Sequence, residues 1–378
     1  MSELAEVLDA IESLSARGER MALATIVGVK GSTYRRPGAR LLIPRTGPMV
    51  GNISGGCLEG EVQEAAHEVM SSRTPRLLTF DLTADDEAVW GWGLGCNGVI
   101  DVFVEPADGA AEVARALRLA LEEERPLAHI TVLESEIDAI RPGNHLVVHP
   151  DGRREGTLGS DGGLVFAHDA EHAIQDGRSQ VVELETEEGK VRTFVEVMEP
   201  PLRLLICGAG HDAIPLVRHA ASLGWHITVA DDRERFLTTE RFPEATDLVH
   251  TKPEEVAERA AVDGRAHAVV MTHNFLRDLG YLRSLFGTEA AYIGMLGPRA
   301  RLDRLLENLA RDGVRPTEED LTKLHGPAGL DLGAEGPEEI AAAIVAEILA
   351  VRRGRSAGFL RERTGPIHDR AVKAGSES

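Results

Sequence analysis

The chain of 378 residues is poor in cysteine and in basic charge. Its three cysteines are Cys57, Cys96 and Cys207, which lie far apart and form no C-x-x-C pair. This spacing argues against a disulfide framework and against a structural zinc site. With 41 basic against 62 acidic residues, the net charge of −21 argues against the basic face that nucleic-acid binding requires.

Long apolar runs are missing as well. No segment approaches the roughly 20 apolar residues that are needed to span a membrane. Apolar residues between Leu4 and Leu14 follow helical spacing among acids and do not form the apolar core of a signal peptide. We therefore expect a cytoplasmic protein that contacts no membrane.

The chain is longer than one hydrophobic core accommodates, so we expect two domains. The boundary is placed at Glu199-Pro200-Pro201, because two successive prolines interrupt regular structure. We predict an N-terminal α+β domain over residues 1–198, a C-terminal domain over 202–360 and a tail over 361–378.

The N-terminal domain contains an internal repeat. Residues 19–38 align without a gap on 124–143, which places Arg36-Pro37-Gly38 on Arg141-Pro142-Gly143 at an offset of 105 residues. The copies extend over about 19–106 and 124–200. Self-similarity of this kind indicates two copies of one α+β unit, although two copies alone can also resemble each other by chance.

Two cysteine loops occur only in the first copy. One reads GNISGGCLEGE (51–61) and the other WGWGLGCNG (90–98). Glycines let a large ligand approach main-chain N–H groups, and a thiolate supplies a soft ligand or a nucleophile. We therefore expect Gly55, Gly56, Cys57 and Cys96 to bind a ligand, the alternative being that each cysteine is a small buried apolar residue. Glu59 either positions a proton or is an ordinary acid in the first turn of a helix over 58–70.

The C-terminal domain shows strands that alternate with helices. Apolar strands are predicted at 202–207, 226–231, 246–250, 267–272 and 291–296, and a helix at 211–224. This alternation is typical of a parallel sheet covered on both faces. We predict a Rossmann-like, doubly wound α/β domain, with Cys207 in its core.

The segment Cys207–Ala213 fits the motif G-x-G-x-x-G/A between a strand and a helix. Gly208 permits the tight turn, and Gly210 lets a pyrophosphate approach the backbone. Asp231 and Asp232 end the next strand, where an acid would bind a ribose hydroxyl. His211 either faces a ligand or caps the helix. The motif predicts a nucleotide ligand; the alternative is a scaffold whose crevice binds something else or nothing.

Taken together, these motifs resemble the XdhC/CoxI family, accessory factors of xanthine dehydrogenase and related molybdenum hydroxylases. The segments that carry the resemblance span nearly the whole chain: GSTYRRPGARLLI (31–43), GNISGGCLEGEV (51–62), LGCNGVIDVFVEP (94–106), CGAGHDAIPL (207–216), VVMTHNFLRD (269–278), YIGMLGPRAR (292–301) and GLDLGAEGPEEIAAAIVAEI (329–348).

The resemblance implies a protein that binds molybdenum cofactor (molybdopterin), supports its sulfuration and inserts it into an apo-hydroxylase of the xanthine dehydrogenase or CO dehydrogenase type. It also implies a cysteine desulfurase as a partner and a homodimer. By position, Cys57 and Cys96 are the candidate molybdenum-contacting thiols. Asn97 and Gly336 depart from the family pattern, in which glycine and threonine are common at these positions.

Hypotheses from different classes remain. The preferred one is a cofactor-insertion chaperone without turnover of its own, since the chain carries no iron–sulfur or flavin motif; such proteins are also labelled xanthine dehydrogenase by association. The alternative is an NAD(P)-dependent oxidoreductase, which the glycine loop and Asp231 suggest, although no acid or base for hydride transfer stands out. In a third hypothesis the C-terminal domain serves only dimerisation and partner docking.

Overall fold

A computed structural model of the chain describes residues 3–82, 97–106, 114–115, 117–118, 125–159 and 162–364. These residues form two compact units that divide between Pro200 and Pro201. Each unit has its own sheets and its own hydrophobic clusters. Among the described residues, no helix is both long enough and apolar enough to cross a membrane.

The N-terminal unit contains two five-stranded antiparallel sheets with the same strand order, β3-β2-β1-β5-β4 and β8-β7-β6-β10-β9. Elements of the first half are α1 (Glu3–Ala16), β1 (Met21–Ser32), β2 (Arg40–Pro44), β3 (Val50–Gly51), α2 (Glu59–Ser72), β4 (Arg76–Asp81) and β5 (Asn97–Pro106). Those of the second half are β6 (Leu127–Ser135), β7 (His145–Val148), β8 (Arg154–Thr157), α4 (Gly162–Asp176), β9 (Gln180–Thr186) and β10 (Gly189–Met198).

The two halves correspond strand by strand, with one correction to the gapless alignment. The Gly38 N–H donates to the Ile26 carbonyl, and the Gly143 N–H donates to the Val132 carbonyl. Ile26 therefore corresponds to Val132 at an offset of 106, although Gly38 and Gly143 keep the offset of 105. The gapless alignment of the first strand was wrong by one residue because the connection that follows this strand is one residue shorter in the second half. Side chains alternate between the two faces of a strand. A shift of one residue in the alignment therefore changes which side chains of the two halves are matched on the same face.

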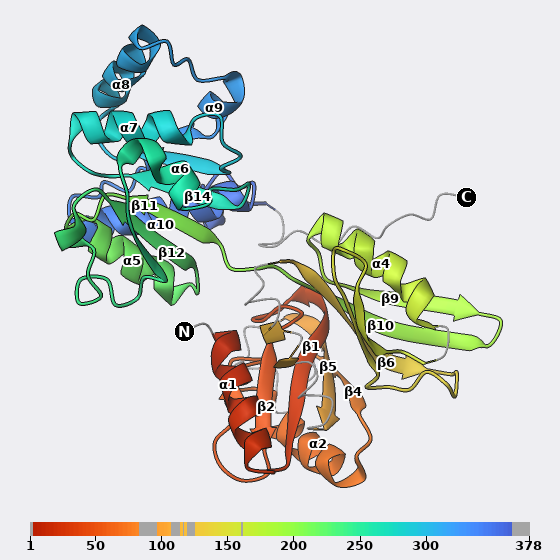
Figure 1. Cartoon of the computed structure of the whole chain (residues 1–378). Helices are drawn as coiled ribbons and strands as arrows, with labels where there is room; N and C mark the ends of the chain where they lie inside the picture. Colours follow the sequence, from red (N-terminus) through yellow and green to blue (C-terminus); the bar gives the residue numbers. More distant parts are fainter. Residues whose placement is uncertain are drawn as a thin grey trace. The chain divides into compact units, whose positions relative to one another are not determined.

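The two sheets pack against each other through their inner faces. The outer faces are covered by α2 and α4, each over its own apolar cluster (Figure 1). On the inner side, two apolar clusters combine residues of both halves. One of them includes residues of α1, and the other consists of Val27, Phe103, Leu133 and Phe194 with two partly buried neighbours. The repeat units thus pack within one chain.

The C-terminal unit is a six-stranded parallel sheet in the order β13-β12-β11-β14-β15-β16. Counted from β11, this order is 3-2-1-4-5-6, that of a doubly wound dinucleotide-binding fold. The prediction of a Rossmann-like domain is confirmed. Its strands are β11 (Arg203–Cys207), β12 (His226–Asp231), β13 (Asp247–His250), β14 (Ala266–Val270), β15 (Tyr292–Met295) and β16 (Leu324–His325).

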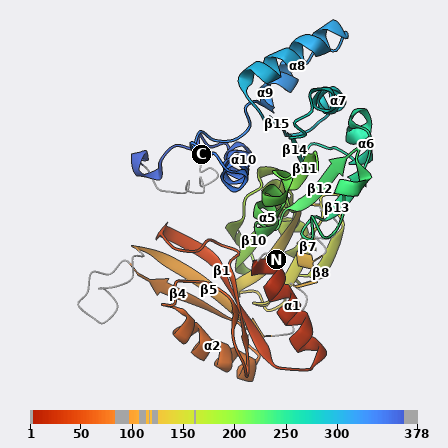
Figure 2. The same cartoon turned by 90° about the vertical axis from the view of Figure 1, so that its left-hand side faces the viewer.

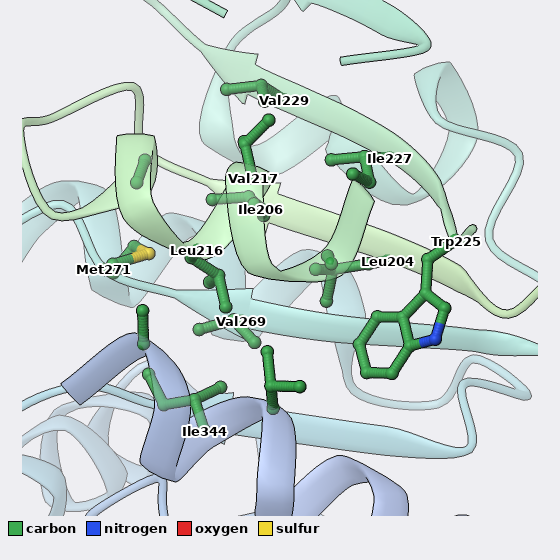
Figure 3. Close-up of a cluster of buried hydrophobic side chains, with 14 of the residues drawn as sticks. Leu204, Ile206, Leu216, Val217, Trp225, Ile227, Val229, Val269, Met271 and Ile344 are labelled. Atoms are coloured by element: carbon green, nitrogen blue, oxygen red, sulfur yellow. The ribbon is translucent and has the colours of Figure 1, made fainter. Parts of the chain in front are cut away.

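Helices cover both faces of this sheet. On one side α5 and α10 pack against β11, β12 and β14 around residues such as Ile206, Leu216 and Ile344 (Figures 2 and 3). On the other side α6, α7 and α8 enclose a second cluster. The helices are α5 (Ala213–Ser222), α6 (Val256–Arg259), α7 (Phe275–Leu285), α8 (Arg299–Arg311), α9 (Glu318–Thr322) and α10 (Pro337–Arg352), with short 3₁₀ turns η1 (Glu234–Phe236), η2 (Pro253–Glu255) and η3 (Leu360–Glu362).

Candidate functional site

The loop that carries Cys57 joins β3 to α2, and Cys57 itself is half-buried. The Ser54 hydroxyl oxygen accepts hydrogen bonds from the backbone N–H groups of Gly56, Cys57 and Leu58 at 3.1, 3.1 and 3.2 Å. The sequence led us to expect main-chain N–H groups that meet a ligand. In the structure these three N–H groups are already hydrogen-bonded within the loop. The group of the loop that suits a soft metal is therefore the Cys57 thiol.

Glu59, the first residue of α2, closes the same loop from the other side. Its carboxylate accepts the Ser54 N–H at 3.0 Å, the Leu58 N–H at 3.1 Å and the Ser54 hydroxyl. A carboxylate at a helix N-terminus also interacts favourably with the helix dipole. Of the two roles considered for Glu59, its contacts are those of a group that holds the loop.

The two glycines before Cys57 differ in what the fold demands of them. Gly56 has a φ of +107°, a backbone conformation that residues other than glycine rarely adopt. Gly55 has no positive φ, and a Cβ built on it would meet no atom within 4 Å. The fold therefore does not require glycine at position 55. Open space beside the Cys57 loop suits the approach of a bulky ligand.

Cys96 lies outside the described residues, as does most of the WGWGLGCNG segment; the structure resumes with β5 at Asn97. Residues 82–96 join β4 to β5 in the first half, whereas Glu187 and Glu188 alone join β9 to β10 in the second. Among the described histidine, cysteine and acidic residues, no group of three or more is placed to hold a metal ion. Metal contact by Cys57 and Cys96 stays a prediction.

Cys207 is fully buried at the end of β11, as predicted. Burial raises the pKa of its thiol far above the ordinary range, and the nearby carboxylates of Asp278 and Asp231 raise it further. Because a thiol reacts and binds metals as the thiolate, Cys207 is chemically inert in the folded protein.

In the glycine loop after β11, Gly208 and Gly210 differ in whether the fold requires glycine at that position. Gly208 has a φ of +118°, and a Cβ there would come within 3.1 Å of the Thr272 backbone. Gly210 has no such constraint, and a Cβ on it would meet nothing within 4 Å. Only Gly208 is thus fixed by the fold. The space at Gly210 is compatible with a ligand close to the backbone.

Asp231, at the end of β12, is buried, and both of its carboxylate oxygens accept hydrogen bonds from protein groups. One oxygen accepts from the Ala209 N–H at 2.7 Å and from Arg233 Nη2 at 2.8 Å, and the other accepts from the Arg233 N–H and Nε. Burial alone would raise the pKa of Asp231, but these hydrogen bonds lower it to about 2. The four acceptor positions of the carboxylate are therefore occupied.

His211 is exposed beside the glycine loop, and its carbonyl accepts the Ile214 N–H. The next residue, Asp212, contacts His273 on the connection after β14, with 2.6 Å between Oδ2 and Nε2. His273 has a φ of +57°, which is uncommon for a residue with a side chain. This acid–imidazole pair lies at the carboxyl ends of β11 and β14, where open α/β sheets bind ligands. Sequence spacing does not reveal this pair, because the two residues are 61 positions apart.

Comparison with known proteins agrees with this architecture. The family described as "XdhC and CoxI family" matches residues 14–81 and 120–185, and the "XdhC Rossmann domain" matches residues 204–348. A crystal structure described as a xanthine dehydrogenase from Bacillus halodurans superimposes with a TM-score of 0.76 at 29% identity. The match covers 93% of this chain and 97% of that one.

Two curated relatives extend along most of the chain. A protein of Bacillus subtilis, described as a probable xanthine dehydrogenase subunit, is 32% identical over 91% of this chain and 96% of its own length. The molybdenum cofactor insertion chaperone PaoD of Escherichia coli is 22% identical over 91% of this chain and 86% of its own length. From these matches, which include both halves of the N-terminal unit and the Rossmann sheet, the chain belongs to the XdhC and CoxI family.

Proposed function

We propose that this protein is an accessory factor that binds molybdenum cofactor, supports its sulfuration and inserts it into an apo-hydroxylase of the xanthine dehydrogenase or CO dehydrogenase type. Membership in the XdhC and CoxI family supports the accessory role, and the similarity to an insertion chaperone supports the cargo. The observation that carries the proposal is the half-buried thiol of Cys57 on a closed, glycine-bounded loop.

The described residues of this loop fit such a cargo. Cys57 offers a soft sulfur ligand, the kind that suits a thiophilic metal centre. The space at Gly55, where a Cβ would meet no atom within 4 Å, leaves the backbone open to a ligand. Ser54 and Glu59 hold the loop in place, so the thiol is positioned before the cargo arrives. When bound, the cofactor would supply the molybdenum and dithiolene chemistry that the hydroxylase uses.

The partners belong to the same proposal. The bound cofactor would receive its sulfur with the help of a cysteine desulfurase, and the protein would act as a homodimer. Analytical ultracentrifugation of the purified full chain measures the oligomeric state directly. A single species of monomer mass at micromolar concentrations would remove the dimer from the proposal.

Transfer of cofactor to a client tests the function. Wild-type protein, Cys57→Ala and Cys207→Ala are each incubated with the same amount of molybdenum cofactor and mixed with apo-xanthine dehydrogenase. Wild type and the Cys207→Ala control should activate the client, whereas Cys57→Ala should activate it at least tenfold more slowly. Equal activation by all three would contradict the role of Cys57, and activation by none would contradict the insertion function.

The rival function, an NAD(P)-dependent oxidoreductase, loses support at Asp231. A ribose hydroxyl could bond this carboxylate only by displacing Arg233 or the Ala209 N–H. We therefore expect calorimetry to detect no saturable binding of NAD(H) or NADP(H) at millimolar concentrations. Binding that is lost in Gly210→Val would restore the rival.

A further inference from the structure

Five charged or titratable side chains are buried between the two sheets of the N-terminal unit: Arg40, Glu105, His129, His145 and Glu196. Each residue is at most 5% exposed. We call this group the polar seam. Buried ionisable groups are rare in proteins unless they are paired, so the seam needs a physical explanation.

The seam is built from one ion pair and one histidine–carboxylate contact, both of which cross between the halves. Arg40 on β2 binds Glu196 on β10, with Nη1 3.0 Å from Oε1 and a second bond from Nη2 to Oε2. His145 on β7 binds Glu105 on β5, with 2.7 Å between Nε2 and Oε2. In each pair, the second strand of one half reaches the last strand of the other.

These four residues occupy equivalent positions in the repeat. Arg40 and His145 correspond at the offset of 105 residues. Glu105 lies opposite Leu23 on β1, Glu196 lies opposite His129 on β6, and positions 23 and 129 correspond at the offset of 106. The seam therefore has a local two-fold arrangement, with arginine in one half where the other half has histidine.

His129 breaks this arrangement. The equivalent residue in the first half is the apolar Leu23, whereas the His129 ring stacks on His145 with centroids 5.1 Å apart. Within the described part of the chain, neither ring nitrogen of His129 has a hydrogen-bond partner, nor does Arg40 Nε. The nearest carboxylate oxygen, Oε2 of Glu196, lies 3.9 Å from Nδ1, too far for a hydrogen bond.

A small cavity adjoins these unpartnered atoms. Its lining includes His129, Arg40 and Glu196 together with Thr25 and Thr131. The space open to the centre of a water molecule is about 10 Å³. This is at the lower limit for holding one water, and internal waters typically bond buried polar groups that have no other partner. The cavity thus meets both conditions, room and polar partners.

We propose that the polar seam holds one internal water, bound by His129 and Arg40 Nε, and that His129 must stay uncharged for the two halves to remain packed. The charges around the ring support the second part. The groups facing His129 are Arg40 on β2, Glu105 on β5, His145 on β7 and Glu196 on β10. A proton on His129 would place a second cation beside Arg40, stacked on the His145 ring and shielded from bulk solvent.

The pKa of His129 is shifted in the direction that keeps its ring uncharged. Burial lowers the pKa of His129, and His145 and Arg40 lower it further, against an opposing effect of Glu196. An unfolded histidine binds its proton near pH 6.5. Because the folded ring binds it at a lower pH, the stability that His129 contributes is complete above pH 6.5 and is lost progressively as the pH falls below it.

Hydrogen exchange on the full chain tests this. Protection of peptides from β6 and β10 is measured at pH 7.5 and 5.5 in wild type and His129→Gln, with correction for intrinsic exchange. Glutamine can bond a water but does not titrate. The ratio of wild-type to variant protection should fall between the two pH values, by up to about tenfold. Peptides from β11, in the other unit, serve as the control and should show no such change.

A ratio of protection that stays constant between the two pH values would overturn the proposal, whether or not protection itself falls in both proteins. If the variant does not fold, the ring ¹⁵N shifts of His129 in wild type decide, because a charged ring at pH 5.5 contradicts the inference. A high-resolution crystal structure tests the water itself: one ordered water beside His129 and Arg40 is expected, and a dry cavity would contradict it.

Discussion

Ser54 and Glu59 form a closed hydrogen-bonded pair at the base of the Cys57 loop. The Ser54 hydroxyl donates to the Glu59 carboxylate, and its oxygen accepts three consecutive backbone N–H groups. The segment SGGCLE is thereby a self-contained structure in which the loop's own groups bond one another around the half-buried Cys57. This pair links the sequence motif to the proposed chemistry, because it fixes where the sulfur is.

Removal of the Ser54 hydroxyl should loosen the loop. In Ser54→Ala, three amides lose their shared acceptor, and we expect a loss of about 1–2 kcal/mol of local stability. Alkylation of Cys57 by iodoacetamide, followed by mass spectrometry, should become several-fold faster. Cys207 serves as an internal control and should stay unmodified, and Ser71→Ala, near the other end of α2, should leave the rate unchanged. A rate equal to wild type in Ser54→Ala would contradict the role of the pair.

The buried pair of Arg40 and Glu196 should be costly to break from one side. Arg40→Met leaves a carboxylate buried without its cation, which should cost about 3–5 kcal/mol in the unfolding of the N-terminal unit. The double variant Arg40→Met, Glu196→Leu should cost clearly less than the sum of the single variants. Calorimetry of the full chain measures both.

Arg76→Met is a matched control for this measurement, since it breaks the exposed contact of Arg76 with Glu68. Exposed ion pairs contribute at most about 1 kcal/mol. Comparable losses in Arg40→Met and Arg76→Met would show that the seam is no more important than a surface contact.

Asp231 should make the C-terminal unit sensitive to strong acid. The pKa of its carboxyl is about 2, below the ordinary value of 3.8, so its contribution is present above about pH 4 and is lost as the pH falls toward 2. The contribution is of order 2 kcal/mol. Asp231→Asn should therefore unfold at a lower temperature at pH 7, with a gap to wild type that narrows below pH 4. A gap that is unchanged at pH 3 would argue against this linkage.

The glycine loop of the C-terminal unit allows a test by paired variants. Gly208→Ala forces a side chain into a φ of +118° and against Thr272, so we expect a loss of at least about 1–3 kcal/mol. Gly210→Ala should stay within about 0.5 kcal/mol of wild type, since its Cβ meets no atom within 4 Å. Thermal unfolding separates the two. Equal losses would mean that the open space at Gly210 is filled in solution.

Much of the fold could be predicted from the sequence because its signals are local. Continuous apolar runs marked β11, β12 and β14, and the glycine motif marked the turn after β11. The repeat was visible in the shared Arg-Pro-Gly segments. The one-residue error at Ile26 arose because β1 and β6 are buried on both faces, so that no alternation of polar and apolar residues fixed the register.

The polar seam and the loop bonds were not predicted, because they depend on contacts that sequence spacing does not reveal. Arg40 and Glu196 are 156 positions apart and become partners only when the two sheets pack. One signal was present, since His129 and Glu196 each stand between two apolar neighbours in their strands. The sequence placed Glu59 in the first turn of a helix but did not indicate which groups its carboxylate would bind.

The most direct test of the proposed function is retention of molybdenum cofactor by purified full-length protein, measured as molybdenum and pterin per chain after gel filtration. Wild type and Cys207→Ala should each retain cofactor in a fixed ratio, whereas Cys57→Ala should lose it. Equal retention by wild type and Cys57→Ala, or no retention by wild type, would contradict a carrier that uses this thiol.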